Sequence, residues 1–295
     1  MSYRLLSKHS SHFNRLIILV FCCSLFTLSQ SAAARIETSK LTNLTYNDQR
    51  QKLDLYIPKH QRRKTALLFI HGGGFTTGNK KAMNGFAKLF AQGGFVSASI
   101  NYRLAPKHPY PAARNDVTDA LDWLKANAEM YQFNENKIVA IGYSAGGTLA
   151  LNLALDGTLK LAAGVSVAGA TDLAILISQT PHRRLKRDLR GYLANTNPHD
   201  ASPIFQVSKH SAPIFLFHGD KDHLVPVSES VALANKLKLL EVPMLLRVFP
   251  DAGHEIMLPN KHLKQLLSEL TRFLVAIDLA DDKKSFPSTT RPEDL

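Results

Sequence analysis

The hexapeptide at residues 142–147, Gly-Tyr-Ser-Ala-Gly-Gly, constrains the fold of this chain more than any other stretch. The apolar run at residues 138–141 precedes it and favours a strand, whereas residues 145–155 follow it and favour a helix. A sharp turn from strand to helix strains the backbone of Ser144, so its neighbours must carry small side chains. Glycine and alanine meet that demand. The stretch therefore predicts a turn that lifts the Ser144 hydroxyl clear of a sheet edge.

The order of strand, Gly-x-Ser-x-Gly and helix is typical of a turn that presents a nucleophilic serine. Glycine-rich turns match the five-residue pattern by chance, and the flanking strand and helix make it specific here. The helix behind the turn directs unpaired N–H groups and its positive end toward charge that develops at Ser144. We therefore interpret Ser144 as a candidate nucleophile.

Length and composition indicate a globular protein with one large core. The 295 residues are 45% hydrophobic and 20% charged, and a single α/β domain of this size is ordinary. After an opening hairpin, apolar runs alternate with amphipathic segments, which predicts a mostly parallel sheet flanked by helices. Strands are predicted at residues 41–46, 52–57, 66–70, 95–101, 138–141, 162–168, 213–218 and 244–249, and helices at residues 81–92, 111–128, 145–155, 227–240 and 261–277.

Residues 1–34 have the layout of a secretory signal peptide. Three basic residues precede the uncharged run 16–28, and the segment ends in Ser-Ala-Ala-Ala. The run is shorter than the ~20 residues of a membrane-spanning helix, which favours cleavage over a retained anchor. Cleavage removes three Lys or Arg and no acid, lowering the net charge from +12 to +9, and removes both cysteines, Cys22 and Cys23. We expect a secreted or periplasmic protein without disulfides.

Residues 35–280 are expected to form one domain with a small lid insertion at about residues 170–212, followed by a disordered tail at residues 281–295. A helix is predicted at residues 182–190 of the lid, with one apolar and one basic face. The basic face is a solvated surface in the simpler interpretation, and a contact surface for anionic membranes or acidic polysaccharide in the other. The apolar stripe holds Leu185, Leu189, Tyr192 and Leu193, and the basic face holds Arg183, Arg187 and Arg190.

A glycine run follows the strand predicted at residues 66–70. His71 leads into three glycines, residues 72–74, and then Phe75. Acyl transfer needs backbone N–H donors aimed at the oxyanion of the tetrahedral intermediate, and glycines let the backbone approach a substrate closely. The N–H of Ala145, next to the candidate nucleophile, offers another donor. A phosphate-binding loop is disfavoured because no Gly-Lys-Ser/Thr follows.

Two more loops follow predicted strands, at residues 218–226 and 251–255. Because the carboxyl ends of parallel strands share one edge of a sheet, both loops are expected beside Ser144. His254 is the candidate base, since it follows a small Ala-Gly pair in the last of these loops. The order serine, aspartate, histidine is the chain order of α/β-hydrolase triads.

Four carboxylates could serve His254. Asp251 lies only three residues away and has little freedom to orient the ring, and Asp220 is better placed to cap its own turn. Asp172 could reach across from the neighbouring loop. Asp222 lies deeper in its loop and precedes Leu-Val-Pro, which can anchor that loop on the body of the protein. We therefore favour Asp222.

Five segments together resemble the α/β-hydrolase esterases: residues 71–75, 101–106, 142–147, 220–226 and 253–254. Residues 102–111 are similar to the hormone-sensitive-lipase-like carboxylesterases, but Tyr143 stands where those carry Asp, and the chain has no room for their large N-terminal cap. Residues 51–56 and 218–226 resemble the feruloyl/acetylxylan-esterase-type branch, which we favour. The resemblance implies a triad of Ser144, Asp222 and His254 and an oxyanion hole formed by the N–H groups of Gly73 or Gly74 and Ala145.

The expected protein is a serine carboxylesterase that hydrolyses small carboxylic esters through an acyl-enzyme, with no metal or organic cofactor and no nucleic-acid partner. Phe75 and Tyr143 flank the expected pocket, where they either shape substrate binding or pack in the core. Alternatives are an amide hydrolase, such as an arylformamidase-like enzyme or a small serine peptidase, and a catalytically dead hydrolase fold used for binding.

Overall fold

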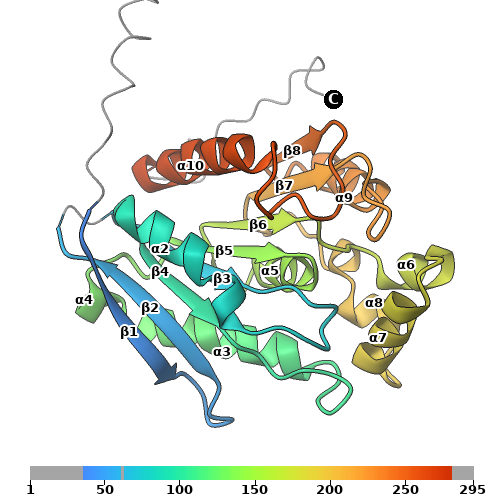
Figure 1. Cartoon of the computed structure of the whole chain (residues 1–295), viewed down its shortest axis with the longest axis horizontal. Coiled ribbons are helices and arrows are strands. Elements are labelled where there is room, and N and C mark those ends of the chain that lie inside the picture. The colour runs from blue at the N-terminus through green and yellow to red at the C-terminus, as the bar shows by residue number, and fades with distance from the viewer. Residues whose placement is uncertain (1–35, 61–62, 281–295) are drawn as a thin grey trace, which may run out of the picture. The chain divides into compact units, whose positions relative to one another are not determined.

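The computed structural model describes residues 36–60 and 63–280. Its strands form one sheet in the order β1-β2-β4-β3-β5-β6-β7-β8. The hairpin β1–β2 and the pair β2–β4 are antiparallel, and the pairs from β4 to β8 are parallel (Figure 1). The strands are β1 (Thr38–Thr45), β2 (Lys52–Pro58), β3 (Ala66–Ile70), β4 (Val96–Ile100), β5 (Ile138–Tyr143), β6 (Ala163–Val167), β7 (Ile214–Gly219) and β8 (Met244–Phe249).

Most predicted helices are present, with three differences, one of which is the separate short helix α4 after α3. The helix predicted at residues 81–92 is divided at Met83 into a 3₁₀ turn and α2, and the lid contains two short helices, α6 and α8, besides the predicted one. In the described part of the chain, no helix is long and apolar enough to cross a bilayer. The helices are η1 (Lys80–Ala82), α2 (Asn84–Gln92), α3 (Ala112–Ala126), α4 (Ala128–Tyr131), α5 (Ala145–Leu155), α6 (Leu173–Gln179), α7 (Arg183–Leu193), α8 (Pro198–Ala201), η2 (Pro203–Phe205), α9 (Ser228–Leu239) and α10 (Leu263–Leu279).

The central strands are buried on both faces because alternate side chains enter different cores. In β3, Leu68 and Ile70 join the core under α3 and α5, whereas Leu67 and Phe69 join the core under α2 and α10. Each of these side chains is fully buried. Burying a side chain of this size on folding stabilises the protein by about 1.5–3 kcal/mol. This two-sided burial explains why the strands are continuous apolar runs and holds their carboxyl ends at one rigid edge.

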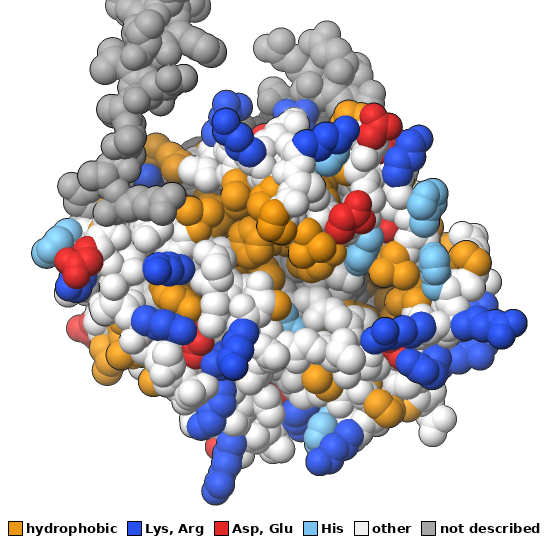
Figure 2. Space-filling model, in the orientation of Figure 1, with side chains coloured by type: hydrophobic (Ala, Val, Ile, Leu, Met, Phe, Trp, Pro, Cys, Tyr) orange, Lys and Arg blue, Asp and Glu red, His pale blue; other side chains and the backbone are white. Residues whose placement is uncertain are grey.

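The lid lies between β6 and β7 and joins the larger core. Leu189, Tyr192 and Leu193 of α7 are buried in the same cluster as α3 and α5. Lys and Arg side chains gather on the outer surface over α7 (Figure 2), where Arg183, Arg187 and Arg190 are exposed. The predicted division of this helix into apolar and basic faces is therefore present.

A buried ion pair connects β2 to η1, the 3₁₀ turn before α2. The Asp54 carboxylate lies 2.6 Å from Lys80 Nζ and accepts a hydrogen bond from Asn84 Nδ2 at 3.0 Å, and both charged side chains are more than nine-tenths buried. Burial by itself raises the pKa of Asp54, but the hydrogen bond from Lys80 and those of the neighbouring donors outweigh it and lower the pKa to about 2.

This pair predicts a pH-dependent contribution to stability. Because the folded pKa of Asp54 lies below its unfolded value of ~3.9, the stabilisation is present above about pH 4 and is lost as the pH falls toward 2. Asp54→Asn should lower the free energy of unfolding by about 3–5 kcal/mol at pH 7, with a smaller deficit at pH 3. Urea titrations at both pH values test this. For Asp122→Asn, at an exposed position, the change in the free energy of unfolding should be the same at both pH values.

Candidate active site

The turn between β5 and α5 has the predicted strained geometry. Ser144 has φ 54° and ψ −124°, a conformation that side chains rarely adopt. A Cβ on Gly142 would collide with the carbonyl of Gly146, and a Cβ on Gly146 would collide with the carbonyl of Ile70. Close backbone contacts at Gly142 and Gly146 thus keep Ser144 in its strained conformation.

Ser144, His254 and Asp222 lie in one hydrogen-bonded row. His254 Nε2 is 2.9 Å from Ser144 Oγ, and His254 Nδ1 is 2.7 Å from Asp222 Oδ2. A carboxylate only accepts, so Nδ1 carries the proton and Nε2 is left to accept the Ser144 proton. The three residues come from the turn after β5 and from the loops after β7 and β8, which meet at the carboxyl edge of the sheet.

The structure separates Asp222 from the other candidate acids. Asp222 is 5% exposed, whereas Asp220 and Asp251 are exposed. Leu224 N and Val225 N each donate to Asp222 Oδ1 at 2.9 Å, which leaves Oδ2 for His254. Burial alone raises the pKa of Asp222, but hydrogen bonds from the nearby histidines His218 and His254 hold it well below its usual range.

Asp172 has a different role in this fold. Its Oδ1 accepts from Ala174 N at 3.0 Å and Ile175 N at 3.1 Å, so it caps α6. The buried Glu229 carboxylate accepts from the N–H groups of Thr171 and Asp172 at 2.7 Å and fixes this loop. Sequence analysis did not single out Glu229, because a glutamate near a helix start resembles an ordinary surface residue.

The glycine loop after β3 packs directly against the serine turn. A Cβ on Gly72 would lie 2.8 Å from the Tyr143 carbonyl oxygen and 3.1 Å from Ser144 Cβ, so glycine is needed for this approach. Gly73 and Gly74 have φ of 123° and 60°. Ala145 is the first residue of α5, where a backbone N–H has no partner within the helix. Gly72 of the first segment and Ala145 of the second thus border Ser144.

Tyr143 and Phe75 each make a contact that connects elements of the site. Tyr143 Oη donates to the His254 carbonyl oxygen at 2.7 Å. Burial, with the nearby charges of Asp222 and Glu255, raises the pKa of Tyr143 to about 12, so it remains a neutral donor. Phe75 is 2% exposed and stacks on Tyr192 of α7, with ring centroids 3.8 Å apart. The core-packing alternative therefore describes Phe75.

The lid supports the glycine loop from the other side. A Cβ on Gly74 would come within 3.7 Å of the Asp188 side chain, and His182 Nε2 donates to the His223 carbonyl oxygen at 3.0 Å in the loop that carries Asp222. The insertion is thus connected to two of the loops around Ser144. The contact between Phe75 and Tyr192 had no sequence signal beyond the apolar stripe of α7.

The stack of Phe75 on Tyr192 predicts a large stability effect. Tyr192→Ala should lower the free energy of unfolding by about 3–5 kcal/mol because it empties a fully buried aromatic site. Tyr192→Phe should leave it unchanged or raise it, since the buried hydroxyl has no hydrogen-bond partner within the described residues. Denaturant unfolding of both variants measures the difference. Equal losses in the two would contradict the packing role.

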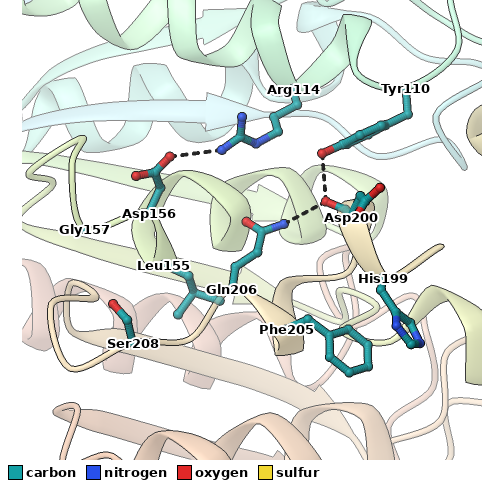
Figure 3. Close-up of a pocket in the computed structure, with 10 residues that line it drawn as sticks. All are labelled: Tyr110, Arg114, Leu155, Asp156, Gly157, His199, Asp200, Phe205, Gln206 and Ser208. Atoms are coloured by element: carbon teal, nitrogen blue, oxygen red, sulfur yellow. Dashed lines mark hydrogen bonds and ion pairs between the residues drawn. The ribbon is translucent and has the colours of Figure 1, made fainter. Parts of the chain in front are cut away.

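A separate hollow of about 660 Å³ lies at the end of α5 farthest from Ser144 (Figure 3). Arg114 pairs with Asp156 at 3.0 Å, and the side chains of Tyr110 and Gln206 donate to the Asp200 carbonyl oxygen. None of the three residues in the hydrogen-bonded row lines this hollow. It is therefore distinct from the candidate active site.

A mostly parallel sheet with a strained serine turn at its carboxyl edge, faced by histidine and aspartate loops, defines an α/β-hydrolase. Solved structures share this fold. A truncated carbohydrate esterase from gut microbiota matches with a TM-score of 0.72 at 22% identity, over 84% of this chain and 99% of that one. An esterase/lipase from an uncultured bacterium matches with a TM-score of 0.69 at 21% identity, over 94% and 95%.

The chain belongs to the BD-FAE family, whose model matches residues 53–237. Among curated relatives, Esterase LipC of Mycobacterium tuberculosis is 30% identical over 70% of this chain and 57% of its own length. An ethyl acetate hydrolase of Pseudomonas putida is 30% identical over 65% of this chain and 66% of its own length. The chain thus spans about half to two thirds of these relatives. The expected esterase branch is confirmed at the level of the family.

Proposed function

We propose that the protein is a serine carboxylic ester hydrolase that cleaves small carboxylic esters through an acyl-enzyme. The observation that carries the proposal is the row from Ser144 Oγ through the His254 ring to Asp222 Oδ2 on a strained turn. The family and the relatives named as esterases support ester hydrolysis. The name ethyl acetate hydrolase supports a short acyl group and a small alcohol.

The proposed reaction begins with attack of Ser144 Oγ on the ester carbonyl carbon, while His254 Nε2 accepts the hydroxyl proton. The N–H groups of Ala145 and of Gly73 or Gly74 stabilise the oxyanion. Asp222 stabilises the charged imidazole, and that imidazole returns the proton to the departing alcohol. Water gives a proton to the same histidine and attacks the acyl carbon; the carboxylic acid then leaves, and the histidine returns the proton to Ser144 Oγ.

Hydrolysis of p-nitrophenyl esters of increasing acyl length, together with labelling by a fluorophosphonate, tests this function. We expect turnover that is highest for the short acyl chains and declines with length. Hydrolysis of anilides in preference to esters would favour the amide-hydrolase alternative. Absence of both turnover and labelling would support a fold used only for binding.

A further inference from the structure

A second histidine lies on the far side of Asp222 from His254. His218, near the end of β7, is fully buried. Its Nε2 is 2.8 Å from the Val225 carbonyl oxygen and 3.3 Å from Asp222 Oδ2, and its Nδ1 is 2.7 Å from Ser230 Oγ. The triad described above makes no use of this ring.

The partners determine which nitrogen of His218 carries the proton. The Val225 carbonyl and the Asp222 carboxylate only accept, so Nε2 must donate. Nδ1 then accepts the hydroxyl proton of Ser230, which lies in the first turn of α9. Ser230 therefore donates to His218, and His218 donates to the loop that carries Asp222.

We propose that His218, locked by Ser230, is a positioning residue that aims Asp222 Oδ2 at His254 and limits the basicity of that oxygen. Asp222 Oδ1 is already fixed by Leu224 N and Val225 N. His218 contacts the remaining oxygen and also donates to the Val225 carbonyl, so the loop is fixed at Asp222 and at Val225. This inference rests on the proposed function, since the triad gives the positioning its purpose.

Removing the His218 donor has a predictable direction. Without that donor, Asp222 Oδ2 keeps more negative charge density and stabilises the charged His254 imidazole more strongly. His254 also contacts Ser144 Oγ and Tyr143, and Glu255 follows it in the chain near the Tyr143 hydroxyl; His218→Leu leaves all three residues in place. The acid limb of kcat/KM should therefore move to higher pH.

Four variants separate positioning from general stability. His218→Leu should lower kcat by about tenfold to a hundredfold with KM unchanged, because the contact of the ring with the Asp222 carboxylate and its hydrogen bond to the Val225 carbonyl are lost. His218→Gln, whose amide nitrogen can donate near the position of Nε2, should restore most of the activity. Ser230→Ala should lower kcat by about two- to tenfold. Leu233→Ala, one turn further along α9 and fully buried, is the matched control for lost packing.

The decisive readouts are the acid limb and the downfield proton resonance of the His254–Asp222 hydrogen bond. Both should shift in His218→Leu. In His218→Gln they should lie close to the wild-type values, and in Leu233→Ala they should equal the wild-type values. An active wild-type enzyme in which neither readout moves in His218→Leu and Ser230→Ala overturns the positioning role alone. A wild-type protein that neither hydrolyses esters nor is labelled by a fluorophosphonate overturns the proposed function, while the resonance still reports whether His218 orients Asp222.

Discussion

Ser144→Ala is expected to lower kcat for ester hydrolysis by about 10⁶-fold, because the attacking oxygen is removed while binding and the oxyanion donors remain. The fold should be preserved. Alanine lacks the hydroxyl but keeps the same backbone constraints, and the turn is held by the contacts of Gly142 and Gly146.

The matched control is Ser166→Ala. Ser166 is 2% exposed in β6, close to the start of α5, and its hydroxyl has no hydrogen-bond partner among the described residues. Its replacement should leave kcat unchanged. Steady-state kinetics of both variants with one p-nitrophenyl ester measures the contrast. Comparable losses in the two would mean that damage near the turn, and not the loss of a nucleophile, explains the result for Ser144.

Asp222→Asn is expected to lower turnover by about 10⁴-fold with the fold intact. The N–H groups of Leu224 and Val225 would hold the amide oxygen in the place of Oδ1, which turns the amide NH₂ toward His254. Nδ1 must then accept, so the ring carries its proton on Nε2 and no longer accepts from Ser144. The loss follows from the wrong tautomer rather than from a cavity.

Asp172→Asn is the control for this prediction and should change turnover little. Asparagine caps helices about as well as aspartate, so α6 keeps the N-terminal hydrogen bonds that Asp172 provides. Kinetics and urea unfolding of both variants test the assignment. A large loss of turnover for Asp172→Asn with little loss for Asp222→Asn would assign the acid to Asp172.

Local patterns predicted the sheet and the serine turn well. The runs at residues 66–70 and 244–249 are strands with the predicted bounds. The first is a continuous apolar run because it is buried on both faces, whereas the second is an edge strand in which Val248 is exposed. The glycines at 142 and 146 signalled close backbone contacts that the structure contains. The signal-peptide and tail predictions at residues 1–34 and 281–295 lie outside the described residues.

Contacts between distant segments could not be predicted in the same way. The stack of Phe75 on Tyr192 and the link from Glu229 to residues 171–172 depend on how the lid and α9 meet the sheet. His218 was visible in its motif, but its place behind Asp222 requires the strand register and the course of the following loop. Sequence periodicity identifies buried faces, and tertiary structure decides which buried polar groups meet.

Mass-spectrometric mapping of the fluorophosphonate adduct tests the central claim most directly. The account predicts one adduct per chain, on Ser144, formed together with the loss of ester hydrolysis and absent from Ser144→Ala. An adduct on another residue, or ester hydrolysis that persists at the wild-type rate in Ser144→Ala, would contradict it.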